Sequence, residues 1–187
     1  KFQINHINPA WFIPVVGNIL VPIAGVPLGY PEISWFFFSI GIVFWLVLLT
    51  IFFNRIIFHD PMPQRLVPTF FILIAPPAVA FIAWFKLGGE LDAFARVLYY
   101  TALFFSLLLA TQIGKFARLP FFLSWWAYSF PLAALTVATM LMYQELQTPW
   151  FKWLSILLLA LVTLVILMLV VKTVAAISSR GICIEEG

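Results

Sequence analysis

The chain has 187 residues, of which 64% are hydrophobic and 9% charged, and its mean hydropathy is +1.10. So few charged residues cannot cover the surface of a soluble domain of this length, and the composition predicts an integral membrane protein. The net charge of +3 comes from ten basic residues scattered singly among apolar stretches, a pattern that does not favour a nucleic-acid partner.

Six apolar segments follow one another, each close to the roughly 20 residues that a helix needs to cross a bilayer. They cover approximately residues 10–26, 34–53, 66–84, 94–113, 120–142 and 150–171. The loops between them are short and contain glycine, proline and charge, so none can hold a soluble domain. We therefore predict an all-α, multi-pass protein of the cell (inner) membrane, with residues 1–187 forming a single transmembrane domain.

Proline falls inside the first, third and fifth segments and inside none of the other three. These prolines are Pro14 and Pro22, then Pro68, Pro76 and Pro77, then Pro131. The inner prolines recur at a spacing of 54 residues, which indicates a repeated hairpin of one broken and one straight helix. Because proline frees a backbone carbonyl, we expect the broken helices to surround a central pore and the straight helices to face lipid. The alternative is the general abundance of proline in membrane helices.

The third broken segment carries Pro131 in its middle, within residues 121–138. Proline donates no hydrogen bond, so the carbonyl of Ala127 loses its helical partner and the helix should kink. In lipid such an opening is tolerated only where it faces protein or a water-filled cavity. Phe130, directly before the break, is therefore expected where the backbone meets a lumen.

The basic residues predict the orientation of the chain. If every segment crosses the bilayer, seven of them lie on one side and three on the other, so the positive-inside bias places both ends of the chain in the cytoplasm. The seven are Lys1, Arg55, Arg65, Lys115, Arg118, Lys172 and Arg180, and the three are Lys86, Arg96 and Lys152.

Residues typical of catalytic or metal sites do not gather anywhere in the sequence. No Asp, Glu, Lys or Arg lies in the interior of a segment, which argues against a proton relay. His6 and His59 lie outside the segments, and Glu90 and Asp92 have no neighbouring histidine or cysteine. The lone Cys183 excludes an intramolecular disulfide. We therefore expect no enzyme, no catalytic residue, no metal site and no cofactor.

Uncharged polar residues on the broken helices are candidates for a pore lining. They are Asn18, Thr69, Ser124, Ser129, Thr136 and Thr139. Hydroxyl and amide groups can replace part of the hydration shell of an ion, and the N-terminal ends of half-helices favour an anion. The alternative for each is a hydrogen bond back to its own helix or to a neighbouring one.

Three runs of sequence resemble one known family. NPAWFIPVVGNILVPIAG, RLVPTFFILIAPPAVAF and LSWWAYSFPLAALT are similar to the fifth, seventh and ninth helices of the tellurite-resistance/dicarboxylate transporter family, which includes bacterial TehA and the slow anion channels of plant guard cells. The resemblance implies ten helices in five hairpins around a central pore, usually in a homotrimer. This sequence supplies three of the five hairpins, so we expect it to be the C-terminal part of a longer protein.

The resemblance also implies a site. A phenylalanine of the ninth helix plugs the pore in that family, and the motif WWAYSF places this pore gate at Phe130. The other candidate lining residues and helix breaks are Pro14, Asn18, Pro22, Pro76, Pro77, Ser129 and Pro131. 

Two functions remain open on this basis, with small inorganic or organic anions and the lipid bilayer as partners. The first is an anion channel that a phenylalanine gates, and the second is a secondary transporter that exports C4-dicarboxylates or tellurite-type oxyanions. A membrane structural or assembly subunit is a third hypothesis.

Overall fold

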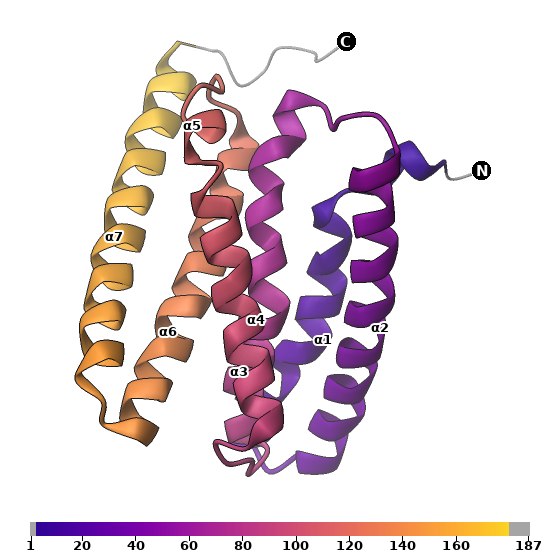
Figure 1. The fold of residues 1–187 in the computed structure, drawn as a ribbon, viewed down its shortest axis with the longest axis vertical. Coiled ribbons are helices and arrows are strands. Elements are labelled where there is room, and N and C mark those ends of the chain that lie inside the picture. Colours follow the sequence, from indigo (N-terminus) through magenta and orange to yellow (C-terminus); the bar gives the residue numbers. More distant parts are fainter. Residues whose placement is uncertain (1–2, 180–187) are drawn as a thin grey trace.

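The computed structural model describes residues 3–179, and all the regular structure in this range is helical. In chain order the elements are η1 (Ile4–His6), η2 (Pro9–Trp11), α1 (Phe12–Gly25), α2 (Pro31–Phe58), η3 (Gln64–Ile74), α3 (Ala75–Lys86), α4 (Ala93–Ala110), α5 (Ile113–Phe116), η4 (Leu123–Tyr128), α6 (Ser129–Leu146) and α7 (Pro149–Ser178), where η denotes a 3₁₀-helix. The long helices run side by side along the long axis of the molecule (Figure 1). Lys1, Arg180 and Cys183, used in the sequence predictions, lie outside the described residues.

The six predicted segments correspond to six apolar helical stretches. Five of these are long and apolar enough to cross a membrane by length and composition: Pro31–Phe58, Gln64–Lys86, Ala93–Ala110, Leu123–Leu146 and Pro149–Ser178. The sixth, Pro9–Gly25, is apolar but shorter. The prediction of a multi-pass, all-α membrane protein is therefore confirmed for the described part of the chain.

Each proline-containing stretch begins as a 3₁₀-helix and continues as an α-helix. The change occurs from η2 to α1, from η3 to α3 and from η4 to α6, and the third residue of each α-helix is a proline: Pro14, Pro77 and Pro131. The first four backbone N–H groups of an α-helix have no partner within the helix, so a proline at the third position sacrifices no α-helical hydrogen bond. The change of helix type thus falls one or two residues before the prolines.

The first stretch was expected to break at Pro22, but its change from 3₁₀-helix to α-helix lies before Pro14. Pro22 lies inside α1, which continues to Gly25, and the N–H of Val26 still donates to the carbonyl of Pro22 over 3.2 Å. Pro22 occupies the last turn of the helix, where the loss of one hydrogen bond does not divide it. Pro14, and not Pro22, is therefore the structural equivalent of Pro77 and Pro131.

α3 forms the centre of the bundle. All residues from Ala75 to Ala83 are buried, and α3 packs against α1, α4 and α6. Within their most apolar 18 residues, Gln64–Lys86 is 78% buried and Leu123–Leu146 is 56% buried, whereas α2 and α7 are each 22% buried and α4 is 33% buried. The broken stretches containing α3 and α6 thus lie further inside than the straight helices.

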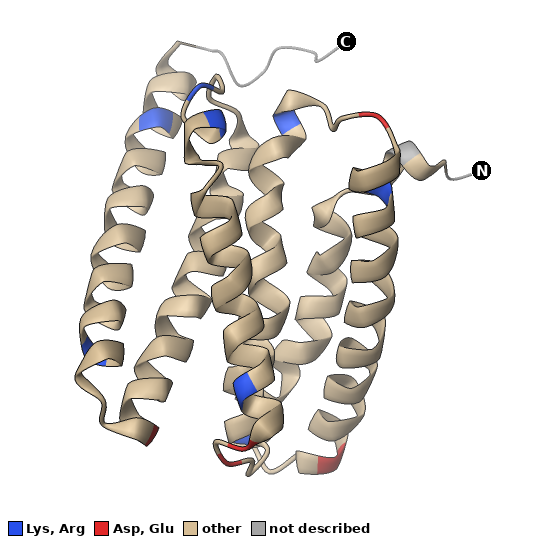
Figure 2. Ribbon diagram, in the orientation of Figure 1, with Lys and Arg blue, Asp and Glu red and all other residues tan. Residues whose placement is uncertain are grey.

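The charged residues lie toward the two ends of the bundle (Figure 2). One end carries Arg55, Arg65, Lys115, Arg118, Lys172 and Asp60, and the other carries Lys86, Arg96, Lys152, Glu32, Glu90, Asp92 and Glu145. Among the described residues, the first end has five basic and one acidic side chain, and the second has three basic and four acidic ones. The partition of basic residues on which the orientation prediction depends is therefore present, while the orientation itself stays a prediction.

Candidate functional site

A half-open cavity of about 500 Å³ lies between the three proline-containing stretches. Every described residue that lines it belongs to these stretches, and none belongs to α2, α4 or α7. The lining consists of Ala10, Ile13, Val16, Gly17, Leu20, Thr69, Ile72, Ala75, Ser124, Ala127, Phe130 and Pro131. A space bounded only by the broken helices is the arrangement that a pore between them requires.

Phe130 is the largest side chain of this lining. It is the second residue of α6, directly after η4 and directly before the buried Pro131, and its side chain is 45% exposed. Proline fixes the backbone on one side of Phe130, and the carbonyl of Trp126 accepts the N–H of Ser129 on the other. The aromatic ring is thus held at a defined level of the cavity wall.

The corresponding position in α1 is Ile13, also the second helical residue and also part of the lining. One turn further along the same face of α1 lies Gly17, and no heavy atom would lie within 4 Å of a Cβ added there. The α1 side of the cavity therefore leaves space opposite the bulky residues of the wall.

The cavity carries no Lys, Arg, His, Asp or Glu among its lining residues. Its two hydroxyl groups are already used: Thr69 Oγ1 donates to the carbonyl of Leu66, and Ser124 Oγ donates to the carbonyl of Arg65. A hydroxyl has one proton to donate, so neither group offers that proton to an anion in this arrangement. The wall is therefore mainly apolar, and its described residues offer neither a charged group nor a free hydroxyl proton to an anion.

Similarity to known proteins identifies the family of the chain. The family model described as SLAC1, voltage-dependent anion channel, matches residues 1–174. The chain belongs to this family of voltage-dependent anion channels. SLAC1-type proteins are channels and not enzymes, and small anions are what such channels conduct.

Among individual relatives, the S-type anion channel SLAH2 of Arabidopsis thaliana is 35% identical over 151 residues, which cover 81% of this chain and 29% of the relative. SLAH3 from the same plant is 37% identical over 132 residues, covering 71% of this chain and 21% of the relative. The protein named Uncharacterized transporter MJ0576 of Methanocaldococcus jannaschii is 29% identical over 167 residues, covering 77% of this chain and 48% of the relative. The chain thus spans between about a fifth and a half of the length of these relatives.

Of the other candidate residues of this SLAC1-family chain, Pro131, Thr69 and Ser124 also line the cavity, and the rest are not among its lining residues. Pro14 and Asn18 line a separate groove of about 250 Å³ between α1 and α2, and Asn18 Nδ2 donates to the carbonyl of Pro14 over 2.8 Å. Pro22, Pro76 and Pro77 are buried in helix packing. The candidate residues that meet at the cavity are therefore Phe130, Pro131, Thr69 and Ser124.

The remaining polar candidates form hydrogen bonds to their own helix or to a neighbouring one, which was the alternative to a pore lining. Ser129 Oγ donates to the carbonyl of Trp126 over 2.7 Å, and Thr136 Oγ1 donates to that of Leu132 over 2.7 Å. Thr139 Oγ1 donates to the carbonyl of Leu135 over 2.8 Å and lies 3.2 Å from the hydroxyl of Tyr99, which then acts as the donor. These hydroxyls stabilise helices and join α4 to α6.

One face of the first stretch lines the cavity although it contains no polar residue that marks it in the sequence. Ala10, Ile13, Gly17 and Leu20 recur at intervals of three and four residues, so they share one face of a helix. Glycine in the middle of a helix lowers the stability of the helix, so its presence indicates a need for open space or for close approach. Gly17 could therefore have marked this face as the one that meets the cavity.

Proposed function

We propose that these residues form part of the wall of an anion-conducting pore in the complete protein, and that Phe130 is its gate. The observation that carries the proposal is a half-exposed aromatic ring in an uncharged cavity bounded only by the three broken helices. Membership of the SLAC1 family supports anions as the permeant species.

The physical basis is the cost of removing an ion from water. An ion without compensating partners is expelled from apolar surroundings, so it crosses a narrow apolar passage only together with water. A phenylalanine ring across the passage excludes that water and needs no charge to do so. Displacement of the ring restores a hydrated path, which passive conduction down the electrochemical gradient then follows.

A secondary transporter that exports C4-dicarboxylates or tellurite-type oxyanions is the second candidate; the name of the Methanocaldococcus relative supports transport but names no substrate. A carrier needs convergent donors that hold its substrate while the site changes sides. The lining residues carry no charge, and both hydroxyls donate to the backbone, so the described part of the cavity supports the channel better.

Electrophysiology of the complete protein under anion gradients separates the two. A channel should give currents whose reversal potential follows the chloride or nitrate gradient and whose size exceeds the turnover of a carrier. Saturable, slow exchange of a dicarboxylate without such currents would contradict the proposal.

A further inference from the structure

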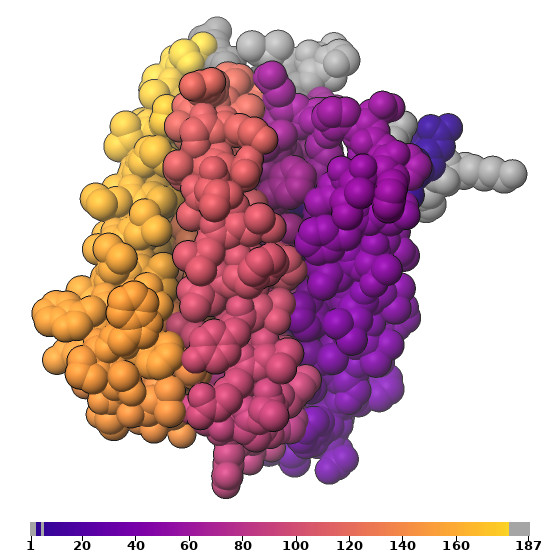
Figure 3. Space-filling model, viewed as in Figure 1, coloured from indigo at the N-terminus to yellow at the C-terminus, as the bar shows by residue number. Residues whose placement is uncertain are grey.

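A second cleft, of about 480 Å³, lies between the outer helices α4 and α7. α7 packs along α6, and α4 packs along α3 and η3, so these two outer helices do not pack tightly against each other. They meet along a seam on the face drawn in Figure 3. The volume falls within the roughly 300–1,000 Å³ typical of ligand sites.

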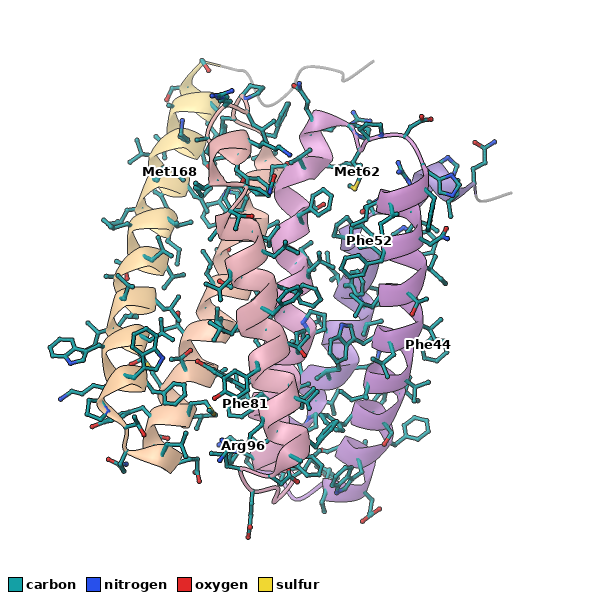
Figure 4. The ribbon with its side chains drawn as sticks, viewed as in Figure 1. Phe44, Phe52, Met62, Phe81, Arg96 and Met168 are labelled. Atoms are coloured by element: carbon teal, nitrogen blue, oxygen red, sulfur yellow. The ribbon has the colours of Figure 1, made fainter. Side chains whose placement is uncertain are left out.

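The walls of the cleft are apolar and one end is basic. Ala110, Leu161 and Met168 belong to its sides, and Trp125 and Tyr128 of η4 belong to its floor. Among the described residues that line the cleft, Lys172 of α7 is the only charged one. Met168 is labelled on α7 in Figure 4. The cleft therefore combines space for a hydrocarbon chain with one positive charge.

Lys172 has no carboxylate partner in the part of the chain that the structure describes. Its Nζ lies 5.3 Å from the centre of the Trp125 ring, a cation–π contact. Lys115 and Arg118 follow nearby on α5 and the next loop, whose residues Ile113, Phe116 and Ala117 also line the cleft. α5, η4 and α7 contain no acidic residue, so this end of the cleft attracts an anion.

Two buried polar atoms on the floor have no hydrogen-bond partner among residues 3–179: Trp125 Nε1 and Tyr128 Oη. Buried polar groups of native proteins are nearly always paired, so unpaired ones call for a partner outside the described chain. Both residues line the cleft, so an occupant with acceptor oxygens would lie beside the side chains that carry these two atoms.

We propose that this cleft binds an anionic phospholipid of the bilayer, with an acyl chain between α4 and α7 and the phosphate on Lys172. Basic pockets between transmembrane helices recognise anionic head groups in this way, and a lysine side chain readily extends along apolar surface toward a phosphate. A zwitterionic lipid fits the apolar walls equally but gains less from the basic end.

The bound lipid acts on the segment that precedes Phe130, a step that rests on the proposed gate. α7 holds η4 through two adjacent residues: Lys172 lies over Trp125, and Thr173 Oγ1 accepts the indole N–H of Trp126 over 3.0 Å. A phosphate that draws Lys172 away from Trp125 weakens one of these contacts, and η4 ends directly before Ser129 and Phe130.

Native mass spectrometry of the complete protein with phosphatidylglycerol or phosphatidylcholine tests the site. We expect tighter retention of phosphatidylglycerol, and about fivefold weaker binding of that lipid in Lys172→Gln, which keeps most of the apolar stem. Lys152→Gln, at the other end of the same helix, is the matched control and should bind as the unmodified protein does. Ala110→Phe, which fills the cleft, should lower binding of both lipids, with thermal unfolding as the check on its fold.

Equal retention of the two lipids, or equal losses in Lys172→Gln and Lys152→Gln, would overturn the lipid site. A photoreactive phosphatidylglycerol should cross-link to the residues of the cleft. If the cleft cross-links to another protein instead, the lipid site is overturned in favour of a helical protein partner. Current per molecule in liposomes tests the coupling separately. Phosphatidylglycerol should change this current in the unmodified protein and at most half as much in Lys172→Gln, and an unchanged response would remove the link to the gate while the binding result stands.

Discussion

At the scale of single residues, Phe130 has two possible roles, gate and packing residue. A buried phenylalanine replaced by alanine costs about 3–5 kcal/mol, but the Phe130 side chain is 45% exposed and lines a cavity. Truncation should therefore cost less stability than it would in the core, which makes the two roles separable.

We predict that Phe130→Ala raises basal anion current in the complete protein, because removal of the ring leaves a wider and wetter passage. The measurement is current normalised to the amount of protein at the cell surface. Unchanged or lower current per molecule would assign Phe130 to packing.

Adding a bulky side chain on the α1 side of the cavity is a matched test of the same proposal. Gly17→Leu should lower the current of the Phe130→Ala protein, because the new side chain enters the same cavity and meets no atom within 4 Å at its Cβ. Gly17→Ala is the control, with little added bulk and an expected gain of up to about 1 kcal/mol in helix stability. Currents that respond equally to both changes would contradict the placement of Gly17 in the conducting path.

At the scale of elements, the hairpin of α1 and α2 depends on a close approach at Gly41. A Cβ added there would lie 2.5 Å from Ile19 Cγ1 and 3.1 Å from the backbone nitrogen of Ile19. Ile19 is fully buried, so little space is available for adjustment.

We predict that Gly41→Val lowers the free energy of unfolding of the detergent-solubilised protein by about 1–3 kcal/mol through overpacking. Gly17→Ala again provides the comparison, since its site is open. Thermal unfolding of the two variants measures the difference, and equal stability would show that α1 and α2 can separate without penalty.

At the scale of the whole molecule, the charge partition between the two ends makes the orientation testable. The end with Lys115 carries five described basic residues and the end with Glu32 carries three, and positively charged ends stay in the cytoplasm. With Cys183 replaced by serine, a cysteine at Glu32 should react with an impermeant reagent from outside, and one at Lys115 should react only after the membrane is opened. The opposite labelling pattern would invert the topology. The homotrimer that the family resemblance implies also stays a prediction.

The sequence by itself determined the class of the protein, five of the six predicted spans as long apolar helices, and the inner position of the stretches that contain α3 and α6. Composition and segment length establish these features because a bilayer accepts only long apolar helices here, and the lost N–H of proline is a local property that any fold must accommodate. Phe130 and Pro131 could be associated with a lumen for the same reason, although the role of gate came from resemblance to a family.

Only the tertiary structure decided which prolines occupy equivalent positions in the three broken stretches, and which face of each helix meets the cavity. Pro14 rather than Pro22 proved equivalent to Pro131, because a proline in the last turn does not divide a helix. Helices that are apolar all round give no periodic signal for their inner face, so Asn18 was expected in a lumen and instead faces α2, while Ile13 and Gly17 line the cavity. The cleft at Lys172 likewise arises from packing between α4, η4 and α7, which are distant in sequence and adjacent only in the folded bundle.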